Sequence, residues 1–88
     1  MIIFQKKEGE IVMNKMIVVF HSLDDIVKFV QKVEKYPYNM DMKRGKYVVD
    51  AKSLLGLLNL GVQREIELNV YEEECGALRK DLEEFVAA

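Results

Sequence analysis

The sequence predicts an α+β domain in which three helices cover one face of a four-stranded sheet, mixed or antiparallel. The expected order is strand, helix, strand, strand, helix, strand, helix. Two observations predict this fold: short β-branched or alternating runs are separated by segments of helical periodicity, and each helical segment carries only one apolar side. Such elements are buried most economically as one layer of helices on a sheet, which leaves the other sheet face in water.

The first strand and the first helix are the clearest elements. Residues 15–20, Lys-Met-Ile-Val-Val-Phe, form an apolar and β-branched run that is typical of a buried strand. Ser22 is a suitable N-cap for a helix with Asp25 in its first turn. This helix should end before Pro37, because the residue that precedes a proline disfavours helical dihedrals. Its apolar stripe is expected to contain Leu23, Ile26, Val27, Val30 and Val33, with Phe29 beside it.

The middle of the chain predicts a hairpin followed by a short helix. Residues 38–42 and 47–49 are expected to pair through a turn at residues 43–46. Ser53 then caps a helix that ends at Gly61, a residue suited to the left-handed conformation at a helix terminus. The apolar residues of this helix are Leu54, Leu55, Leu57 and Leu58.

The last two elements are a half-exposed strand and a helix. Residues 65–71 alternate between apolar and polar side chains, so one face is expected in the core and the other in water. The expected core residues are Ile66, Leu68 and Val70, and the expected wet residues include Glu65, Glu67 and Asn69. Residues 72–86 predict a final helix whose apolar stripe contains Cys75, Leu78, Leu82, Phe85 and Val86.

Composition excludes several classes of function. A formal net charge of −2 argues against a nucleic-acid binder, which normally carries a basic face. With a single cysteine, Cys75, no intramolecular disulfide can form, so a reducing cytoplasmic setting is expected. No apolar stretch approaches the ~20 residues of a membrane span. We expect no metal and no cofactor, because no second cysteine, histidine cluster, phosphate-binding loop or nucleophile–base pair is present, and a stand-alone enzyme is therefore disfavoured.

Residues 1–12 differ from the domain predicted for residues 13–88. We expect a translated leader with the native start at Met13, because residues 7–10, Lys-Glu-Gly-Glu, can be encoded by a purine-rich run that resembles a ribosome-binding site. The alternative is an extra hairpin, formed by residues 2–4 and 11–12 around a polar turn.

Residues 45–62 read Gly-Lys-Tyr-Val-Val-Asp-Ala-Lys-Ser-Leu-Leu-Gly-Leu-Leu-Asn-Leu-Gly-Val. This stretch resembles the family of the histidine-containing phosphocarrier protein (HPr) of the bacterial sugar phosphotransferase system. The shared features are a Gly-Lys turn after the second strand, a Lys-Ser pair that opens a short leucine-rich helix, and a Leu-Gly-Val end. The resemblance implies an open-faced β-sandwich, and the matching order of elements extends it over about residues 13–87.

The sequence departs from this family at the active site. In the family, a histidine at the start of the first helix is followed by Ala-Arg-Pro and accepts a phosphoryl group from enzyme I. Here His21 is the only histidine, no arginine follows it, and counting back from Ser53 by the family interval reaches Ser22 instead. Asp24 and Asp25 stand in the first turn, where each carboxylate disfavours a phosphoryl dianion by roughly 1 kcal/mol or more at an intermediate dielectric.

The resemblance also implies a regulatory site and a docking site. Ser53 matches the residue that a dedicated kinase phosphorylates in Gram-positive members, although a plain helix cap is the simpler explanation. Lys52 lies beside it. The exposed apolar ridge that family partners contact corresponds to Leu54, Leu55 and Leu58.

Three hypotheses follow for the function. The first is a regulatory, protein-binding module with impaired phosphotransfer, whose partners are enzyme I, sugar-specific components, an HPr kinase or a sugar-responsive repressor. The second is an active phosphocarrier that uses His21, with Arg44, Arg64 and Arg79 as the only arginines that could assist it. The third is a small scaffold that self-associates as a homodimer through the leucine ridge.

Overall fold

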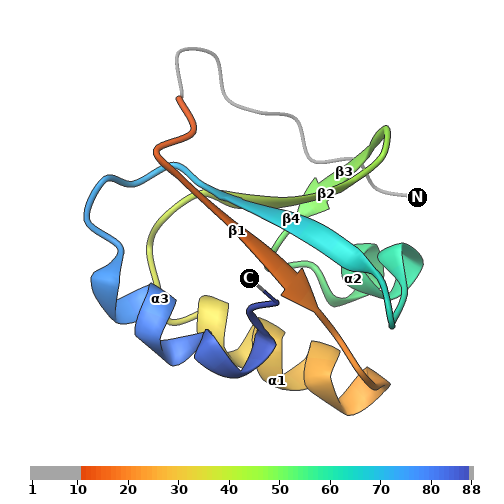
Figure 1. Cartoon of the computed structure of the whole chain (residues 1–88). Helices are drawn as coiled ribbons and strands as arrows, with labels where there is room; N and C mark the ends of the chain where they lie inside the picture. Colours follow the sequence, from red (N-terminus) through yellow and green to blue (C-terminus); the bar gives the residue numbers. More distant parts are fainter. Residues whose placement is uncertain (1–10, 88) are drawn as a thin grey trace.

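The structure, a computed structural model, describes residues 11–87. It confirms the α+β order of elements and places all three helices on one side of the sheet (Figure 1). The strands are β1 (Asn14–Val19), β2 (Met40–Arg44), β3 (Tyr47–Asp50) and β4 (Glu65–Val70), and the helices are α1 (Leu23–Val33), α2 (Leu54–Leu60) and α3 (Gly76–Asp81), followed by a short 3-10 helix, η1 (Glu83–Phe85).

The sheet is antiparallel at every pair, with the strand order β1-β4-β2-β3. Strand β4 therefore lies between β1 and the hairpin strand β2, and it pairs with both of them. The core lies between the sheet and the helices, and it includes Val18, Phe29, Met42, Leu57 and Leu68, each fully buried. The predicted inward residues of the last strand, Ile66, Leu68 and Val70, are all in this core.

Helix α1 begins at the predicted cap. The Ser22 Oγ atom accepts a hydrogen bond from the backbone N–H of Asp25 at 3.2 Å, and the Asp25 carboxylate accepts one from the backbone N–H of His21 at 2.9 Å. The first bond satisfies a helix-terminal donor that would otherwise lack a partner, and the second ties the residue before the cap to the first turn of the helix. The helix ends at Val33, before Pro37, as predicted.

The expected stripe of α1 is wrong at three positions. Leu23 and Val27 are exposed, and Phe29, expected beside the stripe, is fully buried. The Phe29 ring packs edge to face against Phe20, with centroids 5.1 Å apart, and against Phe85, with centroids 5.6 Å apart. The covered arc of α1 is therefore turned toward this aromatic group, which moves Leu23 and Val27 out of the core.

Helix α2 follows the prediction at both ends. The Ser53 Oγ atom accepts the backbone N–H of Gly56 at 3.1 Å, and Gly61 ends the helix with a φ of 89°. Gly56 faces the sheet, where a Cβ atom would lie 2.9 Å from Cβ of Val49. The absence of a side chain at Gly56 lets the helix approach β3 closely.

The final helix is shorter than expected, because residues 72–75 precede α3 and residues 83–85 are 3-10. At the start, the Asn14 side chain donates to the carbonyl groups of Glu72 and Glu73, which holds them in a loop. At the end, Val86 bridges to Val18, and the N–H of Ala87 donates to the carbonyl of Ile17 at 2.8 Å. The chain must leave the helix to reach β1. Cys75 is buried in the core, as predicted.

The sheet face away from the helices is less wet than expected. Asn69 and Asp41 are neighbours across β4 and β2, and both are buried. The Asn69 amide donates to the Asp41 carboxylate at 2.9 Å, and the Tyr71 hydroxyl donates to the other carboxylate oxygen. The expectation for Asn69 is therefore wrong, because its cross-strand partner supplies an acceptor that compensates for the loss of water.

Residues 1–10 lie outside the described part of the chain, so the choice between a leader and an extra hairpin stays a prediction. Residues 11–13 precede β1, and the N–H of Met13 donates to the carbonyl of Val70 at 2.9 Å. Among the helices of residues 11–87, none is long and apolar enough to cross a membrane.

Candidate functional site

His21 lies exposed in the short connection between β1 and α1. Its backbone N–H is bound by Asp25, and its carbonyl accepts the Gln63 side-chain amide at 3.2 Å. The backbone N–H of Gln63 also donates to the carbonyl of Phe20 at 2.7 Å. Gln63 adopts a left-handed φ of 58°, which is uncommon for a residue other than glycine. The connection that carries His21 is thus held from both the helix side and the β4 side.

The charges nearest to His21 along the chain are negative. Asp25 contacts its backbone, and Asp24 is exposed one residue before it. Asp24 pairs with Lys28 at 3.2 Å, and its hydrogen bond raises the pKa of that lysine. This pair is largely exposed to solvent, and such pairs contribute little. Two carboxylates of the first turn of α1 thus lie within four residues of His21 along the chain.

The three arginines lie in different parts of the fold. Arg79 bonds the side chain of Asn14 at the start of β1, at the opposite end of the strand from His21. Arg44 lies in β2, which β4 separates from β1. Arg64 lies between Gln63, whose N–H donates to the Phe20 carbonyl, and Glu65, which pairs with Val19. It is therefore the arginine whose backbone adjoins the connection that carries His21.

The predicted docking ridge is exposed on α2. Leu54, Leu55 and Leu58 are 40%, 66% and 40% exposed, whereas Leu57 and Leu60 are buried on the opposite side of the helix. This division of the leucines agrees with the expectation that a short helix cannot bury all of them.

Lys52, expected beside this ridge, has a structural contact. Its ammonium group donates to the backbone carbonyl of Tyr36 at 2.6 Å, just beyond the end of α1. The lysine therefore joins the loop before α2 to the end of α1.

Leu23 and Val27 are exposed, although the sequence pattern predicts them in the buried stripe of α1. Both lie on the flank of α1 that faces away from α3, because Lys32 on the other flank bonds Asp81 of α3. That flank is on the α2 side, and α1 packs against α2 (Figure 1). Ile26, Phe29, Val30 and Val33 already have i, i+3, i+4, i+7 spacing, so a signal for this orientation was present. We call the exposed set the α1–α2 surface: Leu23, Val27, Leu54, Leu55 and Leu58.

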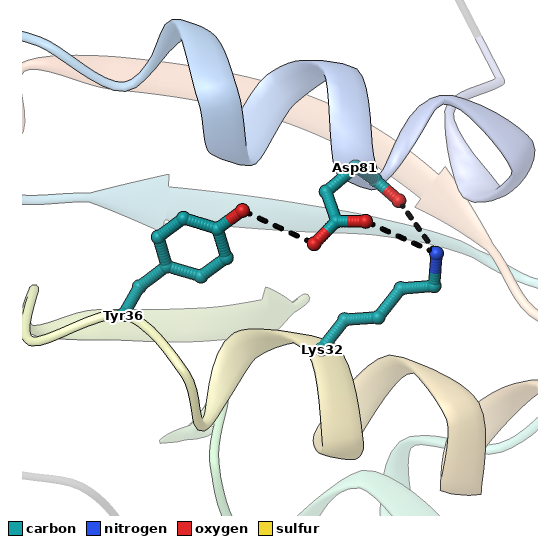
Figure 2. Close-up of polar contacts among 3 residues, drawn as sticks. All are labelled: Lys32, Tyr36 and Asp81. Atoms are coloured by element: carbon teal, nitrogen blue, oxygen red, sulfur yellow. Dashed lines mark hydrogen bonds and ion pairs between the residues drawn. The ribbon is translucent and has the colours of Figure 1, made fainter.

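A polar cluster joins α1 to α3 on the flank of α1 opposite the α1–α2 surface (Figure 2). The Lys32 ammonium group donates to the carboxylate and to the carbonyl oxygen of Asp81 at 3.2 and 3.1 Å, and the Tyr36 hydroxyl donates to the other carboxylate oxygen at 3.1 Å. The hydrogen bond from Lys32, and then that from Tyr36, lowers the pKa of Asp81. Burial, and then the bond to Asp81, raises the pKa of Tyr36. These hydrogen bonds hold α3 against α1 and the residues that follow α1.

No group of three or more His, Cys, Asp or Glu side chains within residues 11–87 is placed to hold a metal ion. The described residues do present an exposed imidazole, two serine-capped helix starts and an apolar surface.

An antiparallel four-stranded sheet with one layer of helices, and with a serine-capped leucine helix after the central hairpin, defines the class of open-faced β-sandwich domains. Residues 26–88 match the family model PTS-HPr, described as "PTS HPr component phosphorylation site". The chain therefore belongs to the HPr family of the phosphotransferase system, whose members are phosphocarrier-like and interact with other components of that system. The matched range includes Ser53 and the whole of α2 but begins after His21.

Solved structures agree on the fold. The chain is similar to the protein in "Crystal structure of HPr-C-His from Thermoanaerobacter tengcongensis", with a TM-score of 0.66 and 22% sequence identity, over 82% of this chain and 89% of that chain. At this identity the likeness establishes the fold alone. No curated protein matches the sequence.

Proposed function

We propose that this HPr-family protein is a regulatory, protein-binding module whose phosphotransfer through His21 is impaired. The observation that carries the proposal is the contact between Asp25 and His21: a carboxylate occupies the backbone donor of the only histidine. Phosphorylation of the imidazole would add negative charge beside Asp24 and Asp25. In the family, helix-start amides and an arginine stabilise that charge.

The α1–α2 surface supports the protein-binding half of the proposal. Monomeric proteins seldom expose a contiguous patch of large apolar side chains without an interaction to explain it. The proposed partners are enzyme I, sugar-specific components, an HPr kinase or a sugar-responsive repressor. The proposed location of the protein is the cytoplasm. Leu54, Leu55 and Leu58 supply the contacts on α2, and Lys52 stands at its start.

Ser53 is the proposed site of regulatory phosphorylation. The residue is partly exposed, and its hydroxyl group accepts a hydrogen bond from the backbone N–H of Gly56. A phosphate there would place a dianion at the edge of an apolar docking surface, where desolvating it opposes partner binding. Incubation with an HPr kinase and ATP, followed by mass spectrometry of the intact protein, tests this site. Ser53→Ala is the control that must abolish any modification.

Labelling with enzyme I tests the main proposal. The full chain is incubated with enzyme I and labelled phosphoenolpyruvate, next to an HPr of normal activity as a positive control. We expect little or no acid-labile label on this protein while it still binds enzyme I in a titration. Efficient labelling that His21→Ala abolishes would reject impaired phosphotransfer, and failure to bind any phosphotransferase-system protein, HPr kinase or sugar-responsive repressor would reject the docking role.

An active phosphocarrier is the second candidate. It is favoured by the exposure of His21 immediately before α1, where the positive end of the helix dipole faces an added anion. Arg64 would then be the cation that stabilises the phosphoryl group. In that case labelling would be efficient, and it would fall in Arg64→Gln but not in Arg79→Gln.

A further inference from the structure

We propose that Gln63, in the loop between α2 and β4, is a positioning residue that holds the His21 side chain in a fixed direction. The inference rests on the proposed function only in taking His21 as the histidine that would accept the phosphoryl group. Gln63 donates two hydrogen bonds to the connection that carries this histidine. Its backbone N–H bonds the Phe20 carbonyl at 2.7 Å, and its side-chain amide bonds the His21 carbonyl at 3.2 Å.

The two peptide groups that flank the Cα atom of His21 are both held by side chains. The peptide group before it donates its N–H to the Asp25 carboxylate at 2.9 Å, and the peptide group after it accepts the Gln63 amide through its carbonyl oxygen. Because peptide groups are planar, restraining both planes restrains the backbone dihedrals of His21 and the direction of its Cα–Cβ bond. Rotation about the bonds of the side chain itself is then the remaining freedom.

The backbone conformation of Gln63 supports a role for its side chain. Its φ of 58° lies in the left-handed region, which a residue with a Cβ atom adopts at a cost. Glycine would adopt this φ without that cost, but it would supply no side-chain donor for the His21 carbonyl. A strained residue in a native structure points to a function that the strain makes possible.

The loop that carries Gln63 is itself held in place. On one side, Val62 packs against the core, and on the other, Glu65 pairs with Val19 of β1. Extending this antiparallel register by two residues places Gln63 opposite His21. The side-chain amide therefore projects from a backbone that is fixed on both sides, which is what a positioning residue requires.

Orientation and charge are separate properties of this site. Under the proposed function, Asp24 and Asp25 oppose an added dianion, whereas Gln63 keeps the histidine aligned for an approaching phosphoryl group. The alignment of reacting atoms can change a rate by orders of magnitude. Loss of the Gln63 bond should therefore slow phosphoryl transfer once the two negative charges are removed.

Nuclear magnetic resonance relaxation of the full chain tests the positioning role. The amide of Ser22 shares a peptide plane with the His21 carbonyl, and in the wild type we expect its order parameter to be about 0.85, typical of rigid backbone. In Gln63→Met and Gln63→Gly it should fall below about 0.6. Methionine has a similar length without a donor, and glycine suits the left-handed φ and so protects the fold. Gln31→Met, at an exposed residue of α1, is the matched control and should leave the value unchanged.

Labelling by enzyme I gives a second readout, in the neutralised variant Asp24→Asn, Asp25→Asn. Adding Gln63→Met to this variant should lower kcat for phosphoryl transfer about tenfold and leave KM nearly unchanged, because the leucines of α2 are untouched. Adding Gln31→Met should change neither constant. If the neutralised variant takes no label, the order parameter alone decides.

A Ser22 order parameter that stays at the wild-type value in both Gln63 variants would overturn the proposal, whatever the labelling shows. An equal kcat with and without Gln63→Met would overturn it as well. Efficient labelling of the wild-type chain would instead reject impaired phosphotransfer and leave the role of Gln63 intact, so the two failures are distinguishable.

Discussion

The Asp25 carboxylate accepts the backbone N–H of His21 at 2.9 Å, while the Asp25 N–H donates to the hydroxyl of Ser22 at 3.2 Å. These two bonds stabilise the start of α1, and they place a negative charge beside the histidine that would accept the phosphoryl group. The same residue therefore favours the fold and, under the proposed function, opposes phosphotransfer.

Neutralising this turn should restore phosphate acceptance. In the double variant Asp24→Asn, Asp25→Asn we expect labelling of His21 by enzyme I to rise about fivefold for each charge removed, since each contributes roughly 1 kcal/mol of repulsion. An asparagine at position 25 keeps an oxygen that can accept the N–H of His21, so the cap survives. Glu83→Gln is the control, because it removes a negative charge at an exposed residue of η1. Unchanged labelling in the double variant would show that these carboxylates are not the cause.

The Ser53 hydroxyl is expected to contribute to stability as well as to regulation. Ser53→Ala should lower the free energy of unfolding by about 1 kcal/mol, because the N–H of Gly56 loses its acceptor. Ser53→Asp retains a capping oxygen and should stay near the wild-type value. Urea denaturation followed by circular dichroism measures both. Equal stability of the alanine variant and the wild type would remove the hydroxyl from the energetics of α2.

Gly56→Ala should destabilise the protein although alanine is the better helix former. Helix propensity alone predicts a gain of about 1 kcal/mol. The new Cβ would lie 2.9 Å from Cβ of Val49, so α2 must move away from β3, and we expect a net loss of about 1–3 kcal/mol.

Chemical denaturation measures this loss, with Gly76→Ala as the matched control. A Cβ at position 76 meets nothing within 4 Å, so that variant should be neutral or slightly more stable. In a double-mutant cycle, Val49→Ala should cost less in the Gly56→Ala background than in the wild type if crowding is the cause, because it removes the Cγ2 atom that would lie 3.2 Å from the new Cβ. A stabilised Gly56→Ala variant would contradict the close approach of α2 to the sheet.

The Tyr36–Asp81–Lys32 cluster predicts how stability depends on pH at both extremes. The pKa of Asp81 is lowered from an ordinary 3.8, so its contribution is present above that value and is lost as the pH falls through the folded-state pKa. The pKa of Tyr36 is raised from an ordinary 10.0, so its contribution is complete below pH 10.0 and is lost as the pH rises through the folded-state value.

Unfolding free energies measured across the pH range test the two arms separately. Asp81→Asn should reduce the acid-side loss, and Tyr36→Phe should reduce the alkaline-side loss. Tyr38→Phe is the control, since Tyr38 stacks near Tyr36 but makes no bond to Asp81. An alkaline arm that is the same in Tyr36→Phe and the wild type would remove Tyr36 from this role.

Local signals in the sequence determined most of the fold. The β-branched run of β1, the Ser22 and Ser53 caps, Gly61 and the alternation of β4 each act over a few residues, so their neighbours along the chain suffice to predict them. For the candidate site, the sequence indicates residues, and their roles stay predictions. The only histidine and the Lys-Ser-Leu-Leu block are visible in the chain, and the described structure places His21 and the α2 leucines at the surface.

Tertiary contacts alone decided the rest. Periodicity indicates that α1 has an apolar side, but the packing of Phe29 against Phe20 and Phe85 selected which flank is covered, and so exposed Leu23 and Val27. Asp41 became the partner of Asn69 because β2 pairs with β4 across a long separation in sequence. The physical reason is the same in both cases: burial depends on which elements meet in space, and a one-dimensional pattern does not specify these neighbours.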